Sequence, residues 1–202
     1  MPKVILVRHG ETDWNRSGQI MGRLPVPLNA RGREQAKALA HALKEQPIAA
    51  IYSSPVLRCL QTAQIISAVL DIPLFEEPGL TEVDFGQWEQ KFWSELAHDP
   101  IRQELYRSPE VAHPPGGETL SEVQQRAVTA VTKVVDSNLT PYPVMILSHA
   151  DVLRSILGYF LHLSLEQTRR VVFSHAAGSV LEIQPDGGTW LHRLNCYSFV
   201  TP

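Results

Sequence analysis

Short, uninterrupted runs of apolar residues alternate along this chain with longer stretches in which apolar residues recur every three or four positions. Residues 4–7 form the first run, and residues 49–53 and 143–147 form two more. Runs of this kind are typical of strands that are buried on both faces of a sheet. The stretches between them have helical spacing. This order predicts a mainly parallel sheet between helical layers, which is a three-layer α/β/α sandwich.

Start signals mark the predicted helices. Asn29 is suited to cap one helix, Pro55 to begin a second, and Thr119 with Glu122 forms a capping box before a third. The glycine pair before Thr119 therefore leads into a helix, and the chain has no Gly-x-x-x-x-Gly-Lys-Ser/Thr motif that would indicate an ATP-dependent kinase. The apolar positions of the three helices are, in order, Ala36, Leu39, Ala40 and Leu43; Val56, Leu60, Ala63, Ile66 and Leu70; and Val123, Ala127 and Val131.

Two histidines directly follow predicted strands. Arg8 and His9 end the first run, and Ser148 and His149 end the run at 143–147. In open α/β sheets, ligands bind beyond the carboxyl ends of the parallel strands. His9 has the chemistry of a nucleophile toward phosphorus, and the guanidinium fork of Arg8 matches phosphate oxygens. The alternative for His9 is a strand-end histidine that only caps a carbonyl group.

Further residues could complete such a site. Arg58 lies in the first turns of the second predicted helix, where free backbone N–H groups already favour an anion; its alternative is a solvated surface arginine. A protonated His149 would donate hydrogen bonds to the equatorial oxygens of a transferring phosphoryl group. Glu82 is the first choice for a carboxyl that protonates a leaving alkoxide. The pattern leaves Asp84 and Asp151 open for that role.

Several motifs occur in an order that one enzyme family shares. They are Leu6-Val7-Arg8-His9-Gly10-Glu11-Thr12 with Trp14-Asn15; Pro27-Leu28-Asn29 with Gly32; Tyr52-Ser53-Ser54-Pro55 with Arg58 and Gln61-Thr62-Ala63; Glu82-Val83-Asp84-Phe85-Gly86-Gln87-Trp88-Glu89; Gly116-Gly117-Glu118; and Ser148-His149. Each motif alone is weak, but this order is hard to obtain by chance. On these motifs the chain resembles the histidine phosphatase superfamily, which includes cofactor-dependent phosphoglycerate mutases, over nearly its whole length.

The resemblance implies a role for each matching residue. His9 becomes the phosphorylated nucleophile and Glu82 the acid and base, with cations around the phosphate. The implied reaction is a pair of in-line displacements that needs no metal and no cofactor, because two arginines and a protonated histidine supply the charge that magnesium supplies elsewhere. The candidate catalytic residues are His9, Glu82, His149, Arg8 and Arg58, and the candidate phosphate- or substrate-binding residues are Asn15, Met21, Gly22, Ala150, Arg102 and Arg107.

Three positions depart from the family's usual pattern. Met21 stands where relatives carry a serine, threonine or glutamine that hydrogen-bonds the phosphate, and a thioether cannot donate, so one contact is expected to be lost. Gln90 stands where a glycine is usual. Asp151 stands where a small residue is common, and it either orients His149, narrows the range of anions accepted, or caps the following helix.

Residues 88–115, the cap segment, are the predicted substrate cap. Four prolines break the segment into short pieces, and a loop-rich segment over a rigid pocket commonly sets binding selectivity. Phe92 and Leu96 are interpreted as anchors on the core. Arg102 and Arg107 either meet a carboxylate or second phosphate on the substrate or lie solvated on a helix face.

Composition favours one compact enzyme. A chain of 202 residues without a linker predicts a single domain over residues 1–202, and a net charge of -3 without a basic cluster argues against a nucleic-acid partner. No apolar segment approaches membrane-spanning length. The start at Met1 runs directly into a core strand, and Cys59 and Cys196 form no disulfide framework, so a cytoplasmic location is expected. Residues 190–202 are expected to pair with a second subunit in a homodimer or to fold back on their own core.

Three functional hypotheses differ in the fate of the phosphoryl group once it is bound to His9. A phosphatase acting on a small phosphorylated metabolite is favoured, because mutases of this family resemble longer chains whose cap and tail keep water from the phosphoenzyme. Phosphoglycerate mutase is the alternative. A catalytically weak sensor of phosphorylated ligands comes third, suggested by Met21 and Asp151.

Overall fold

The computed structural model describes residues 3–184 and 188–197, which form a sheet of six strands in the order β3-β2-β4-β1-β5-β6. The strands β1 to β4 run parallel, whereas β5 is antiparallel to β1 and β6 is antiparallel to β5. The mainly parallel sheet is therefore confirmed. The strands are β1 (Lys3–Arg8), β2 (Ala50–Ser53), β3 (Leu74–Glu76), β4 (Val144–Ser148), β5 (Gly178–Ile183) and β6 (Thr189–Cys196).

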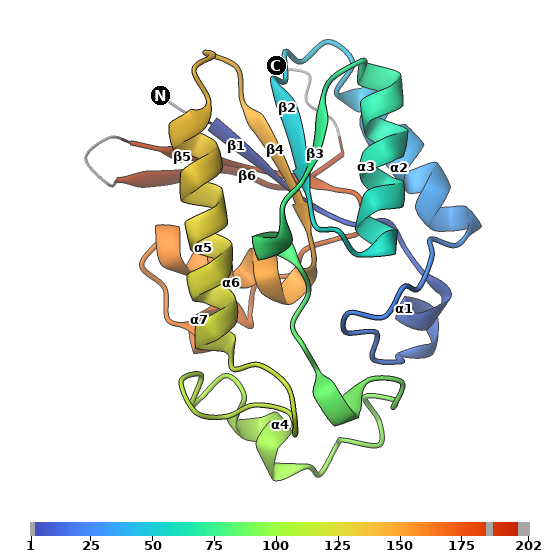
Figure 1. Cartoon of the computed structure of the whole chain (residues 1–202), viewed down its shortest axis with the longest axis vertical. Coiled ribbons are helices and arrows are strands. Elements are labelled where there is room, and N and C mark those ends of the chain that lie inside the picture. The colour runs from blue at the N-terminus through green and yellow to red at the C-terminus, as the bar shows by residue number, and fades with distance from the viewer. Residues whose placement is uncertain (1–2, 185–187, 198–202) are drawn as a thin grey trace.

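Helices cover both faces of the sheet (Figure 1). The helices α2 (Ala30–Ala42) and α3 (Leu57–Leu70) lie on one face, and α5 (Leu120–Ser137) and α6 (Ala150–Phe160) lie on the other. Alternate residues of β1 enter the two cores: Val4 and Leu6 pack in the core on the α5 and α6 side, and Ile5 and Val7 in the core on the α2 and α3 side. Burial on both faces explains why the strand is apolar without interruption.

The helix starts follow the predicted signals with one exception. Asn29 accepts a hydrogen bond from the backbone N–H of Gly32 at 2.8 Å, and the capping box of Thr119 is present. Helix α3 begins at Leu57, so Pro55 lies just outside it. Its buried side is also rotated from the predicted apolar face, because it consists of Arg58, Cys59, Thr62, Ala63 and Ile66, while Leu60 and Leu70 are only half-buried.

The cap segment extends from the end of the molecule beyond the carboxyl ends of β1 and β4 (Figure 1). Leu96 and Leu105 are buried and fasten it to the core, as expected for Leu96. Phe92 is 40% exposed, so its predicted role as an anchor is wrong. The short helices are α1 (Asp13–Ser17), α4 (Pro100–Glu104) and α7 (Leu165–Thr168), with 3-10 turns η1 (Pro78–Leu80) and η2 (Gly86–Trp88).

The carboxyl-terminal strand β6 pairs with β5, so the described part of residues 190–202 folds back on its own sheet. Residues 198–202 lie outside the described residues. Trp190 and Leu194 remain exposed at this edge of the sheet. Within the described ranges, none of the helices combines the length and the apolar character that a membrane crossing requires.

Candidate active site

The two histidines meet at the carboxyl ends of β1 and β4, which are neighbours in the sheet. The backbone N–H of His9 donates to the carbonyl of Ser148 at 3.1 Å, and the rings of His9 and His149 lie 5.4 Å apart between centroids. Both side chains are almost fully buried. The pairing of these two strands, which are far apart in the sequence, therefore brings the two predicted imidazoles together.

His9 presents one ring nitrogen as an acceptor. Its Nδ1 lies 2.7 Å from the carbonyl oxygen of Gly10, and since a carbonyl only accepts, Nδ1 carries the proton. Nε2 is then the unprotonated nitrogen, and it accepts a hydrogen bond from Nε of Arg58 at 3.3 Å. Burial, reinforced by the charges of Arg58 and Arg8, holds the pKa of His9 well below its ordinary value. His9 is thus neutral and carries the lone pair that a nucleophile needs.

Arg58 is fully buried, so its alternative as a solvated surface residue is wrong. Its position near the start of α3 directs the guanidinium back toward the strand ends. Nη2 donates to the carbonyl of Gly22 at 2.8 Å and to Nδ1 of His149 at 2.9 Å, while Nη1 donates to the carbonyl of Leu24 at 3.3 Å. The loop around Gly22 therefore holds the guanidinium against both histidines.

His149 is the N-cap residue of α6 and is oriented from two sides. Because Arg58 can only donate, Nδ1 of His149 accepts, and Nε2 donates to Oγ of Ser54 at 2.8 Å. Burial and the charge of Arg58 hold the pKa of His149 well below its ordinary value. His149 becomes a donor to phosphate only when Nδ1 gains a proton, which a nearby anion favours.

Glu82 faces both residues with one carboxylate oxygen. Its Oε2 lies 3.7 Å from Nη2 of Arg58 and 3.5 Å from Nδ1 of His149, and Oε1 accepts from the backbone N–H of Val83 at 3.0 Å. Burial raises the pKa of Glu82 to about 7, with the charge of Asp151 adding to this and that of Arg58 opposing it. A carboxyl with this pKa holds a proton it can donate near neutral pH.

The other two carboxylates have different surroundings. Asp84 accepts from the backbone N–H of Gly86 at 2.9 Å and pairs with Arg23 at 3.4 Å, which are structural contacts outside the cavity lining. Asp151 binds Tyr106 of the cap segment and Arg154 of α6 through Oδ1. It makes no capping bond, so the predicted capping role of Asp151 is wrong; His149 occupies the N-cap position of α6, without a side-chain capping bond.

One guanidinium nitrogen of Arg8 makes a hydrogen bond, and another has no hydrogen-bond partner among the described residues. Nη1 donates to the carbonyl of Phe173 at 2.8 Å, while the buried Nε has no hydrogen-bond partner among the described residues. Burial lowers the pKa of Arg8 to about 10, which still leaves it charged at neutral pH. A buried N–H without an acceptor is costly, and an anion in the cavity would provide one for this guanidinium.

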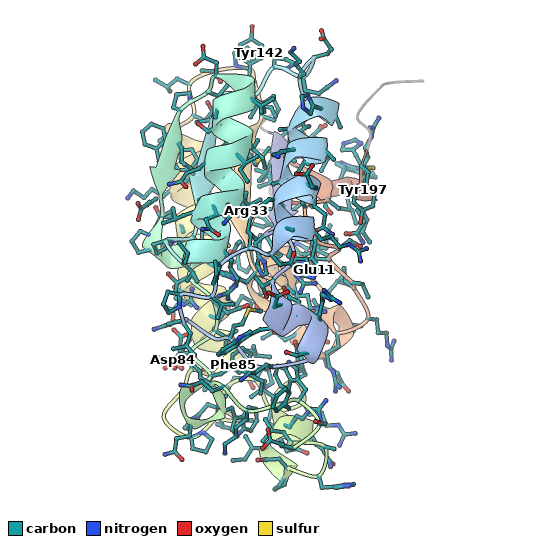
Figure 2. All side chains as sticks on the ribbon, turned by 90° about the vertical axis from the view of Figure 1, so that its right-hand side faces the viewer. Glu11, Arg33, Asp84, Phe85, Tyr142 and Tyr197 are labelled. Atoms are coloured by element: carbon teal, nitrogen blue, oxygen red, sulfur yellow. The ribbon has the colours of Figure 1, made fainter. Side chains whose placement is uncertain are left out.

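Arg8, His9, Glu82 and Asp151 line a cavity of about 230 Å³ at the end of the molecule that carries the cap segment. Figure 2 shows Asp84 and Phe85 toward that end and Tyr142 at the opposite end. Arg58 and His149 are fully buried and are not among the described lining residues. The described lining residues are Arg8, His9, Trp14, Asn15, Gly18, Gln19, Ile20, Met21, Gly22, Glu82, Phe85, Trp93, Ala150 and Asp151.

The predicted binding residues fall into two groups. Asn15, Met21, Gly22 and Ala150 line the cavity, and the sulfur of Met21 accepts from Oγ1 of Thr12 at 3.2 Å. The structure does not bring Arg102 and Arg107 to the lining. Arg102 donates to the carbonyl of Trp93 at 2.8 Å and stacks on its ring, and Arg107 is an exposed residue 3.8 Å from Glu104.

Three supporting residues were not anticipated from the sequence. Ser54 accepts from His149, and Nδ1 of His175 lies 3.1 Å from the carbonyl oxygen of His9, to which it donates. Arg126 donates to the carbonyl of Glu82 at 3.1 Å. Cys59 is a buried packing residue, as expected, and burial raises the pKa of its thiol above the ordinary range.

The described part of the chain contains no cluster of three or more His, Cys, Asp or Glu side chains arranged to hold a metal ion.

Comparisons with known proteins show which family the chain resembles. A sequence model of the histidine phosphatase superfamily (branch 1) matches residues 4–196. Phosphoserine phosphatase 1 of Hydrogenobacter thermophilus is 30% identical over 187 residues, covering 91% of this chain and 88% of that protein. The 2,3-bisphosphoglycerate-dependent phosphoglycerate mutase 2 of Gloeobacter violaceus is 29% identical over 195 residues, covering 93% and 88%. The solved structure of Bacillus stearothermophilus YhfR is similar with a TM-score of 0.86 at 30% identity, covering 95% and 96%.

Proposed function

The chain belongs to the histidine phosphatase superfamily, and on that premise we propose that it is a metal-independent phosphatase that hydrolyses a small phosphorylated metabolite through a phosphohistidine intermediate. One observation supports this most directly. An unprotonated Nε2 of His9 shares a cavity with a charged Arg8 and with Glu82, whose pKa is raised to about 7. Nucleophile, anion clamp and proton donor are the parts that phosphoryl transfer needs.

In the first step, the lone pair on Nε2 of His9 attacks phosphorus as the P–O ester bond breaks. Glu82 gives its proton to the departing oxygen, which leaves as an alcohol. Arg8, Arg58 and protonated His149 stabilise the charge that spreads over the equatorial oxygens. The hydrogen bond from Nδ1 to the carbonyl of Gly10 keeps the ring oriented and supports the positive charge that the ring gains on phosphorylation.

In the second step, the Glu82 carboxylate takes a proton from water as the water oxygen attacks phosphorus. The P–N bond breaks, inorganic phosphate forms, and His9 and Glu82 return to their starting states. The carbonyl of Glu82 is held by Arg126 at 3.1 Å and by Nε of Arg23 at 3.2 Å. This keeps one carboxyl in place for both proton transfers.

Phosphoglycerate mutase is the second candidate, supported by the relative that carries that name. Mutases were expected to be longer chains, but length does not distinguish the two functions here. The alignment with that relative covers 93% of this chain and 88% of the relative. A phosphoglycerate also carries a carboxylate, and Arg8 is the sole cationic side chain among the described lining residues. This favours hydrolysis of a monoester over transfer between positions of phosphoglycerate.

An activity panel tests the proposal. Wild-type protein should release phosphate from at least one of a set of sugar phosphates, phosphoserine and an aryl phosphate, and His9→Ala should release none. His41→Ala, an exposed histidine on α2, is the matched control and should behave as wild type. Undiminished turnover by His9→Ala would contradict the covalent route. Sustained interconversion of phosphoglycerates primed by a bisphosphate would instead support the mutase.

Three further expectations remain proposals. A cytoplasmic location is supported by the two cysteines, both of them free, since cytosolic thiols stay reduced. The absence of a nucleic-acid partner is supported by the net charge of -3. A homodimer is supported by the exposed apolar side chains of Trp190 and Leu194 at the β6 edge, and sedimentation analysis would test it.

A further inference from the structure

Asp151 is a charged side chain in the cavity that the proposed reaction does not use. It lies in the first turn of α6, two residues after His149, and lines the same cavity as His9 and Glu82. Its side chain is 18% exposed. Asp151 is thus close enough to a bound ester to act on the part of the substrate that leaves.

Two hydrogen bonds fix the orientation of the Asp151 carboxylate, and both of them are made to the same oxygen. Oδ1 accepts from the hydroxyl of Tyr106 and, at 2.8 Å, from Nη1 of Arg154. The hydrogen bonds that the described residues make to this carboxylate all fall on Oδ1. Oδ2 is therefore the oxygen that remains available to a ligand in the cavity.

Arg154 pairs with Asp151 at 2.8 Å and offsets part of its charge, but it does not itself line the described cavity. Nε of Arg154 is held by the carbonyl of Val171 at 2.8 Å. The negative charge of Asp151 also reaches Glu82, because it helps to raise the pKa of that carboxyl group. Of the Asp151–Arg154 pair, the carboxylate is therefore the member that the cavity presents to a ligand.

A substrate carboxylate beside Asp151 would find no free cationic partner in the described lining of the cavity. Of the described lining residues Arg8 is the one cation, and its guanidinium is committed to the phosphate in the proposed reaction. Of the cations in the cap segment, Arg102 lies at Trp93, Arg107 and Lys91 are exposed, and none of the three lines the described cavity. A carboxylate near Asp151 would therefore be desolvated without a cationic partner among the described lining residues, whereas a hydroxyl or ammonium group would gain an acceptor.

We propose that Asp151 is a specificity-determining residue: its free oxygen accepts a hydrogen bond from a donor group on the alcohol portion of the substrate and repels a carboxylate there. The inference deepens the proposed function and depends on it. It assigns to this chain phosphomonoesters of carboxylate-free alcohols. Asp151 would then discriminate in two ways: it disfavours the binding of an ester that carries a carboxylate, and it accepts a hydrogen bond from an ester that carries a donor group.

Two esters that differ at one carbon provide the test. Glycerol 3-phosphate and 3-phosphoglycerate share a skeleton and differ by a hydroxymethyl group in place of a carboxylate. For wild type we expect kcat/KM to favour glycerol 3-phosphate by about tenfold or more. Asp151→Asn keeps the shape and an oxygen for Tyr106 but removes the charge, so it should reduce this ratio by about tenfold. Using the ratio at one pH cancels the effect of the variant on the proton of Glu82.

Asp136→Asn, an exposed aspartate on α5, is the matched control and should leave the ratio unchanged. A wild-type preference for 3-phosphoglycerate, or an unaltered ratio in Asp151→Asn, would overturn the inference. The pair phosphoethanolamine and phosphoserine, which differ only by a carboxylate, should give the same order.

A binding measurement separates this inference from the proposed function. Titration calorimetry of the same esters with His9→Ala needs no turnover, and it should rank the carboxylate-free ester of each pair as the tighter ligand. Lack of hydrolysis with this ranking preserved would sink the phosphatase but support the role of Asp151. Hydrolysis with equal or reversed affinities would do the opposite.

Discussion

At the scale of single residues, the burial of Glu82 sets the pH range in which its carboxyl group can donate a proton. Burial raises its pKa to about 7, so the carboxyl is protonated below that pH and becomes a carboxylate above it. The first step needs the protonated form. For an alkyl phosphate we therefore expect kcat/KM to fall as the pH rises through about 7. His9 adds no opposing change in this range, because its pKa lies well below its ordinary value.

Glu82→Gln should lower kcat/KM for an alkyl ester by about 10²–10⁴ and abolish the fall above neutral pH. An aryl phosphate, whose leaving group needs little protonation, serves as the control substrate and should lose less. A pH–rate profile of both proteins on both esters checks this. If Glu82→Gln kept the wild-type descending limb, a different group would be the acid.

The backbone of Gln90 has a conformation that glycine adopts more readily than glutamine. Its φ is +72°, in the left-handed region that glycine adopts without a steric penalty. Gln90→Gly should therefore raise the free energy of unfolding by about 0.5–1.5 kcal/mol. Gln87→Gly, at a neighbouring glutamine outside that region, should lower it by about 0.5–1 kcal/mol. Chemical denaturation of both variants measures the difference, and equal destabilisation would refute the assignment of strain at Gln90.

The sequence predicted which candidate residues meet at the site better than it predicted the residues that support them. His9, Arg8 and His149 follow strands, and strand ends gather at one edge of a sheet. Ser54 and His175 were missed because their contribution depends on which side-chain atom faces which, and a hydrogen bond to Nε2 of His149 leaves no periodic trace. Arg102 carried the right charge for a substrate contact, but its stacking on Trp93 depends on the fold of the cap segment.

At the scale of elements, the start of α2 depends on two glycines that meet. A Cβ on Gly32 would lie 2.1 Å from the carbonyl oxygen of Glu11, and a Cβ on Gly10 would lie 2.5 Å from that of Gly32. Because the obstructing atoms are backbone, the loop after β1 would have to move away from α2. His9 lies at the beginning of that loop.

Gly32→Ala should consequently lower the free energy of unfolding by about 2–4 kcal/mol and reduce activity as well. Arg33→Ala is the control, because Arg33 is an exposed neighbour on the same helix and should change stability by less than about 0.5 kcal/mol. Thermal unfolding combined with a phosphatase assay tests both effects. Similar stabilities of the two variants would show that the close approach is not required.

Hydrophobic periodicity predicted the strands and most helices but only part of the buried face of α3. It located Ala63 and Ile66, which are buried, but it also pointed to the half-buried Leu60 and Leu70 and missed Arg58 and Thr62. These two are buried through polar contacts, since Oγ1 of Thr62 accepts from the backbone N–H of Gly10 and Arg58 binds both histidines. Apolar spacing cannot detect a helix face that is selected by the site it supports.

At the scale of the whole molecule, the strand order explains why the site exists. Placing β4 next to β1 brings Ser148 opposite Arg8, and the helices that follow β2 and β4 deliver Arg58 and orient His149. The strand pairing brings together residues that are some 140 positions apart in the sequence, 149 − 9 = 140. Topology, rather than any local motif, therefore assembles the candidate site.

Since cationic side chains from several elements supply the charge at this site, removing metal ions should not affect the reaction. We expect kcat/KM to be the same before and after dialysis against a strong chelator, and unchanged when magnesium or zinc is restored. A magnesium-dependent phosphatase assayed in parallel shows that the chelator is effective. Activity that disappears on dialysis and returns with one metal would contradict the metal-independent mechanism.

The central claim is that phosphoryl groups pass through Nε2 of His9, and rapid quenching under alkaline conditions tests it most directly. Protein mixed with a ³²P-labelled substrate and quenched within its first turnovers should carry acid-labile, base-stable label on the peptide that contains His9. The label should be missing from His9→Ala and present in His41→Ala. Turnover without label on that peptide, or label on a different residue, would contradict the account.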